Sequence, residues 1–109
     1  MDLNDYQSQI RQHINYPTEV GPYSVILALM KDVGHLSEKL DDVLINDHGS
    51  FDDKKRLSTG ITIGDILFDI VNLASDLNYS LNEIAAINLM KHNKESENKD
   101  KSKKEETKE

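Results

Sequence analysis

The sequence ILALMKDVGHLSEKLDDVLI, residues 26–45, decides how this chain of 109 residues folds. Its apolar side chains recur every three or four residues, which is the spacing of one face of an α-helix. Because proline suits the first turn of a helix, Pro22 places the helix start near Gly21, and we expect the helix to run to about Ile45. The apolar stripe consists of Ile26, Leu29, Met30, Val33, Leu36, Leu40, Val43 and Leu44.

Two more helices and a loop are predicted on either side of this segment. The first helix covers about residues 4–14 and ends before Tyr16-Pro17, because a residue that precedes proline avoids the α-helical region. Residues 46–57 are polar and contain the turn signal Asp47-His48-Gly49, so we expect a loop there. The next helix begins at Ser58 or Thr59 and is expected to bury Ile63, Ile66, Leu67, Ile70, Val71, Ala74 and Leu77.

A fourth helix and a tail complete the predicted organisation. Ser80 and Glu83 form a capping box, which marks a helix start, and we expect this helix to fray near His92. Residues 94–109 contain no apolar residue, so burial cannot offset the entropy of ordering them. The sequence therefore predicts an all-α, four-helix domain over residues 1–93 and a disordered, charged tail over residues 94–109.

Composition and charge restrict the classes of partner. The tail holds six lysines and six acidic residues, so the net charge of −7 lies entirely in residues 1–93. An acidic domain repels phosphate backbones, which argues against a nucleic-acid partner. The longest apolar run, Val25 to Met30, is too short to cross a membrane, the N-terminus lacks a basic leader, and cysteine is absent. We expect a cytoplasmic protein without a membrane partner.

Two polar pairs, each beside a glycine, suggest where chemistry takes place. Asp32 and His35 are three residues apart, as are Thr62 and Asp65, so each pair shares one helix face. The second pair belongs to a polar stripe without a basic residue, Thr62, Asp65, Asp69, Asn72 and Asp76. Such a stripe is either the water-facing side of a helix or a cation site, because a bound cation relieves the repulsion between neighbouring carboxylates.

The order of several short motifs resembles the MazG-like nucleotide pyrophosphohydrolases. The run LALMKDVGHLSEK, residues 27–39, is similar to the family's opening motif, in which Glu-Glu is followed by Gly-Glu-Leu. The resemblance covers roughly residues 3–93. Its other parts are Tyr6-Gln7, Tyr16-Pro17, Gly64-Asp65-Ile66-Leu67-Phe68, Asn72-Leu73-Ala74, Leu77, Ser80-Leu81, Glu83-Ile84-Ala85 and Asn88-Leu89-Met90-Lys91.

The resemblance implies a fold, an assembly and an activity. The implied fold is a four-helix MazG-like bundle that assembles as a homodimer or a homotetramer. The implied reaction cleaves a nucleoside triphosphate between its α and β phosphates, giving a monophosphate and pyrophosphate. Divalent cations held by Glu-x-x-Glu and Glu-x-x-Asp motifs neutralise phosphate charge and activate water.

This chain departs from the family pattern at the metal ligands. Asp32 and His35 stand in place of two glutamates, Thr62 stands in place of another, and Asp65 is unchanged. Asp69, one turn after Asp65, can compensate with its charge, and Glu38 offers the same one turn after His35. The predicted ligands of Mg²⁺ or Mn²⁺ are therefore Asp32, His35, Asp65 and Asp69, and the motif positions imply Tyr16, Asn88 and Lys91 as nucleotide contacts.

Three functions remain open on the sequence, and no catalytic residue is assigned. We favour a nucleotide-binding protein in which triphosphate hydrolysis is reduced or lost, because two charged motif ligands remain of four. The alternatives are an active pyrophosphohydrolase with altered ligands and a helical interaction module without a nucleotide, whose polar stripes face water.

Overall fold

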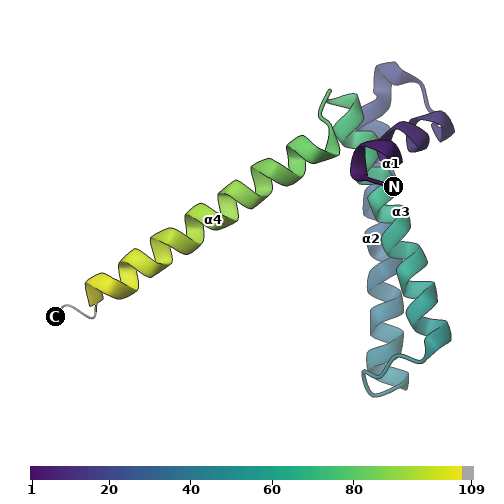
Figure 1. Cartoon of the computed structure of the whole chain (residues 1–109). Coiled ribbons are helices and arrows are strands. Elements are labelled where there is room, and N and C mark those ends of the chain that lie inside the picture. Colours follow the sequence, from purple (N-terminus) through teal and green to yellow (C-terminus); the bar gives the residue numbers. More distant parts are fainter. Residues whose placement is uncertain (107–109) are drawn as a thin grey trace.

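The structure, a computed structural model, describes residues 1–106 and shows an all-α protein, as predicted, without a strand in that range. Helices α2 and α3 form an antiparallel pair, α1 lies across one end of the pair, and α4 points away from it (Figure 1). Two short 3₁₀ turns, Arg11–His13 and Thr18–Val20, connect α1 to α2. The helices are α1 Leu3–Ile10, α2 Gly21–Asn46, α3 Asp53–Asp76 and α4 Leu81–Glu106.

The turn between α2 and α3 has the predicted position. His48 and Gly49 adopt the left-handed backbone region, and the N–H groups of Asp47 and Gly49 both donate to the Val43 carbonyl at 3.0 Å. This arrangement ends a helix by giving its last carbonyl groups a partner. It allows α3 to return along α2.

Helix α3 begins at Asp53, so the predicted start at Ser58 or Thr59 is wrong. The Asp52 side chain accepts a hydrogen bond from the backbone N–H of Lys55 at 2.7 Å and caps the helix. The first turn of α3, Asp53 to Arg56, is polar, and Lys55 there pairs with Asp42 of α2 at 3.0 Å. The composition of this turn therefore resembled that of a loop.

Helix α4 begins as predicted and continues further than expected. The Glu83 N–H donates to the Ser80 hydroxyl at 3.1 Å and the Ser80 N–H donates to the Glu83 carboxylate at 3.2 Å, which confirms the capping box. The helix passes His92 and reaches Glu106, so disorder over residues 94–109 is not confirmed, and residues 107–109 lie outside the described range. Acids placed four residues before lysines, such as Glu95 before Lys99, favour a solvent-exposed helix.

A small apolar core joins α1, α3 and α4. Val71, Ala74 and Leu81 are buried together, and Tyr6 and Ile10 of α1 pack against them. The Gln7 side chain completes this junction with polar contacts. Its amide nitrogen donates to Ser75 Oγ and to the Tyr79 carbonyl, both at 2.9 Å, and its oxygen accepts from the Leu81 N–H at 3.0 Å.

The two long helices bury polar residues and expose apolar ones. On α3 the predicted burial of Val71 and Ala74 is confirmed, whereas Ile63 is 53% exposed and Leu67, Ile70 and Leu77 are also exposed. The buried polar residues of α3 are Thr59, Thr62, Asp69 and Asn72. The prediction failed because it assumed that the apolar stripe faces the rest of the same chain.

The four helices do not close around one core. The radius of gyration is 18.8 Å, compared with about 13 Å for a compact domain of similar length. A closed four-helix bundle is therefore not confirmed within one chain.

One helix of the described part, α3, is long and apolar enough to cross a membrane by length and composition alone. Core helices of soluble proteins pass the same test, and α3 carries the buried side chains of Asp69 and Asn72.

Candidate functional site

Polar side chains line the contact between α2 and α3, and we call this group the polar seam. It consists of Asp32 and Lys39 on α2 and of Thr62, Asp65 and Asp69 on α3. Asp32 meets Asp69, and Lys39 meets Thr62. Asp32 and Lys39 are seven residues apart on α2, and Thr62 and Asp69 are seven apart on α3, so the two contacts lie about two turns, or about 10 Å, from each other along the antiparallel pair.

Asp69 is the most unusual member of the polar seam. It is only 5% exposed, and its Oδ2 atom has no hydrogen-bond partner among the residues that the structure describes. Burial raises the pKa of Asp69 to about 7, helped by its hydrogen-bonding contact with Asp32 and by the charges of Asp32 and Asp65. The Asp32 and Asp69 carboxyl groups therefore either share a proton or need a cation between them.

The four predicted metal ligands do not all converge. Asp32 and Asp69 lie together, Asp65 is exposed but near enough for its charge to act on Asp69, and His35 is exposed on α2. Among the side chains that the structure describes, no three acidic or histidine side chains form a ready metal site. Two carboxylates nevertheless fit Mg²⁺, which binds proteins through one or two carboxylates and completes its octahedral shell with water and substrate phosphates.

Lys39 is a member of the seam that the sequence did not single out. Its ammonium group donates to Thr62 Oγ1 at 2.6 Å and to the Ser58 carbonyl at 2.9 Å. Thr62, which was predicted to stand in place of a metal ligand, is 4% exposed, and its hydroxyl accepts a hydrogen bond from the Lys39 ammonium group. The available signal was that Lys39 is the basic residue on the polar side of α2.

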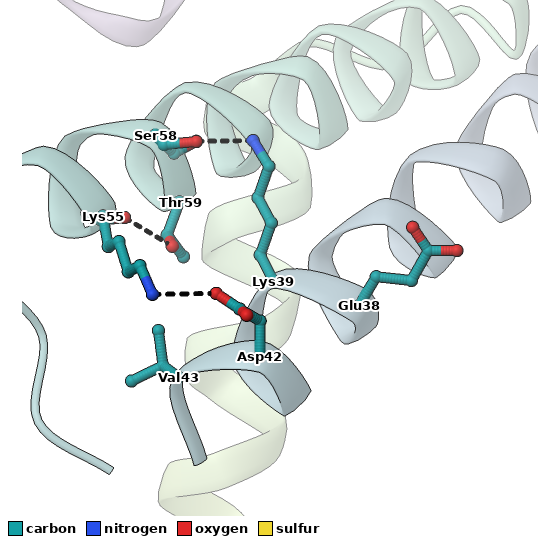
Figure 2. A pocket seen from close by; sticks show the side chains of 7 residues that line it. All are labelled: Glu38, Lys39, Asp42, Val43, Lys55, Ser58 and Thr59. Atoms are coloured by element: carbon teal, nitrogen blue, oxygen red, sulfur yellow. Dashed lines mark hydrogen bonds and ion pairs between the residues drawn. The ribbon is translucent and has the colours of Figure 1, made fainter. Parts of the chain in front are cut away.

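A cavity of about 250 Å³ adjoins Lys39 at the turn end of the helix pair (Figure 2). Figure 2 shows the Lys39 side chain crossing from α2 to the Ser58 carbonyl of α3. On the other side of the cavity, Lys55 pairs with Asp42 at 3.0 Å and with Asp47. These hydrogen bonds, first that of Asp47 and then that of Asp42, raise the pKa of Lys55 to about 12.

Tyr16, a predicted nucleotide contact, is held in a different cluster. Its hydroxyl donates to Asp76 Oδ2 at 2.9 Å and accepts from Arg11 at 3.0 Å. Arg11 also donates to Asp76 Oδ1 at 3.0 Å and to Asn72 Oδ1 at 3.2 Å, and Asn72 is 1% exposed. Burial, followed by the bond to Asp76, raises the pKa of Tyr16. The cluster fixes the segment before α2 onto α3.

The remaining predicted nucleotide contacts lie on α4. Asn88 and Lys91 are both exposed, and α4 leaves the α2–α3 pair (Figure 1). One chain therefore does not bring these two side chains onto the face that carries Asp32 and Asp69.

Comparison of the chain with protein-family models, with curated proteins and with solved structures found no match.

Proposed function

We propose that this chain is a MazG-like nucleotide-binding protein in which α2 and α3 hold one divalent cation, Mg²⁺ or Mn²⁺, that binds nucleotide phosphates. The observation that carries the proposal is the buried Asp69 carboxyl group, with its unpartnered Oδ2 atom, against Asp32. A buried carboxylate without a partner is costly, and a cation removes that cost. A polar stripe that served only as a water-facing surface would not be buried in this way.

Asp32 and Asp69 are the proposed direct ligands of the cation, and Asp65 supplies further negative charge. When bound, the cation neutralises phosphate charge and polarises a phosphoryl oxygen. Asp32 and Asp69 belong to two rigid helices, so their carboxyl groups approach from opposite sides of the same contact.

We further propose that triphosphate hydrolysis is reduced or lost. His35 is exposed, and the Thr62 hydroxyl is occupied by Lys39. Two positions of the family's four-carboxylate pattern therefore contribute no negative charge beside the cation. The chain keeps groups suited to binding a metal–phosphate complex but has fewer groups to activate water.

A second copy of the chain is the proposed partner, in a homodimer or a homotetramer. Apolar side chains project from the outer faces of the long helices, including Met30 and Leu44, which are both 66% exposed. Soluble monomers rarely leave such continuous apolar surface in water. If Asn88 and Lys91 contact the nucleotide, they do so from α4 of that second copy.

A thermal-shift screen of nucleotides, with and without Mg²⁺ or Mn²⁺, tests the proposed function. We expect a nucleoside triphosphate to raise the melting temperature only when the cation is present, since ligands that bind the folded state stabilise it. The Asp69→Asn variant should lose this response, and the exposed control Asp41→Asn should keep it. No shift with any nucleotide and cation would refute the proposal.

An assay of pyrophosphate release separates binding from catalysis. We expect release below that of an active pyrophosphohydrolase, or none, under conditions in which the nucleotide raises the melting temperature. Sustained turnover that Asp65→Ala abolishes would instead establish the active enzyme.

A further inference from the structure

The Lys39 ammonium group occupies a defined position in the polar seam. It links α2 to α3 by donating to Thr62 Oγ1 at 2.6 Å and to the Ser58 carbonyl at 2.9 Å. An ammonium group has three donors, so these two contacts leave one donor unassigned. Lys39 is half-buried, and it borders the cavity shown in Figure 2.

Thr62 and Lys39 together carry the same net charge as one carboxylate with a bound divalent cation. A carboxylate with a divalent cation carries a single net positive charge, and so does a threonine hydroxyl with a lysine ammonium group. The Thr62 position does not fit a metal ion, because its hydroxyl is neutral and already accepts a hydrogen bond from Lys39. Replacing a glutamate and its divalent cation with Thr62 and Lys39 therefore removes the ion and keeps the same local charge.

We propose that the Lys39 ammonium group is a built-in cation that takes the place of a second divalent ion in the polar seam and binds a nucleotide phosphate. This inference rests on the proposed function, since it adds a second positive group to the same phosphate site. The Asp32–Asp69 contact, which would hold the cation, and the Lys39 ammonium group lie about two helical turns apart along the seam. A chain of linked phosphates bridges them better than a single phosphate.

The neighbouring charges favour Lys39 over Lys55 as the phosphate contact. Lys55 is held by two carboxylates, Asp42 and Asp47, which compensate its charge. Lys39 is held by a hydroxyl and a carbonyl, which are neutral and leave its positive charge available. Glu38 also borders the cavity, and its carboxylate repels phosphate.

The first test counts Mn²⁺ ions bound per chain by electron paramagnetic resonance titration of the full-length protein. We expect one ion in the wild type and two in the double variant Lys39→Met with Thr62→Glu. Thr62→Glu alone should still bind one ion, because the new carboxylate pairs with Lys39. The control double variant Lys54→Met with Ser50→Glu makes the same charge change at exposed positions and should bind one.

The outcomes separate this inference from the proposed function. One ion in both the wild type and the Lys39→Met, Thr62→Glu variant would overturn the role of Lys39 and leave the Asp32–Asp69 site standing. No ion in the wild type but one in the double variant would support Lys39 and refute the proposed cation at Asp69. No ion in either protein would refute both.

A single substitution tests the phosphate contact if the double variant does not fold. Methionine preserves the unbranched stem of lysine, so we expect Lys39→Met to keep the helical circular dichroism spectrum. Its affinity for inorganic pyrophosphate with Mg²⁺ should fall about tenfold or more, which is typical for loss of a charged hydrogen bond. Lys54→Met should keep wild-type affinity, and equal affinities in all three proteins would overturn the proposal.

Discussion

The protonation of Asp69 links the stability of the protein to pH. Its pKa is raised from 3.8 to about 7 in the folded chain, so the folded state binds the proton more tightly than the unfolded state. The stabilisation by this proton is complete below pH 3.8 and is lost as the pH rises to about 7. Because one pKa unit corresponds to about 1.4 kcal/mol, we expect Asp69→Asn to increase the free energy of unfolding at pH 8 by up to about 4 kcal/mol.

Urea denaturation between pH 5 and pH 8, without divalent cations, measures this effect. The free energy of unfolding of the wild type should fall as the pH rises across that range. The Asp69→Asn variant should not show this fall, because asparagine does not ionise. Mn²⁺ added at pH 8 should stabilise the wild type but not the variant. Parallel pH profiles for the two proteins would contradict the assigned role of Asp69.

Gly21 leaves room for the buried Asp76 carboxyl group. A Cβ atom at Gly21 would lie 2.6 Å from Asp76 Oδ2, whereas a Cβ atom at Gly60 would meet nothing within 4 Å. We expect Gly21→Ala to cost about 1–3 kcal/mol of stability, because it disturbs the Arg11–Tyr16–Asp76 cluster. Gly60→Ala should instead stabilise α3 by about 0.5–1 kcal/mol. Urea denaturation of the two variants and the wild type measures both changes, and equal effects of the two substitutions would contradict the prediction.

At the level of helices, residues 94–100 of α4 lie on the surface of the molecule. Side chains of residues 94–100 are exposed, and their i,i+4 charge pairs are each worth about 0.2–0.5 kcal/mol. Such a segment gains little from packing. We expect its amides to exchange with solvent quickly, whereas amides near Val71 should be strongly protected. Protection in residues 94–100 equal to that of α3 would indicate a packing partner for α4.

The sequence predicted the helices better than it predicted their contacts. The capping box at Ser80 and the turn at His48 are local signals, and both are confirmed. The polar stripe of α3 could be read from the spacing of its residues, but not its burial, because spacing does not show which face meets which neighbour. The contact between Lys39 and Thr62 joins residues far apart in the chain, so no local pattern revealed it.

For the whole molecule, the outer apolar surface predicts self-association. Val33, Leu40 and Leu44 line a hollow of about 430 Å³ on α2 and are all exposed. We expect Leu40→Glu to shift the protein toward the monomer in sedimentation velocity, because a charge in an apolar interface is costly. Ser50→Glu, which adds the same charge in an exposed loop, should leave the assembly unchanged. A wild-type protein that remains monomeric at high concentration would refute the proposed homodimer or homotetramer.

The inward polar face and outward apolar face of the α2–α3 pair make protein concentration part of the folding equilibrium. If each chain completes its apolar core only against another, dilution removes that core and the melting temperature falls with the amount of protein. Newly synthesised chains would then mature by a bimolecular step, at a rate set by how often two of them meet.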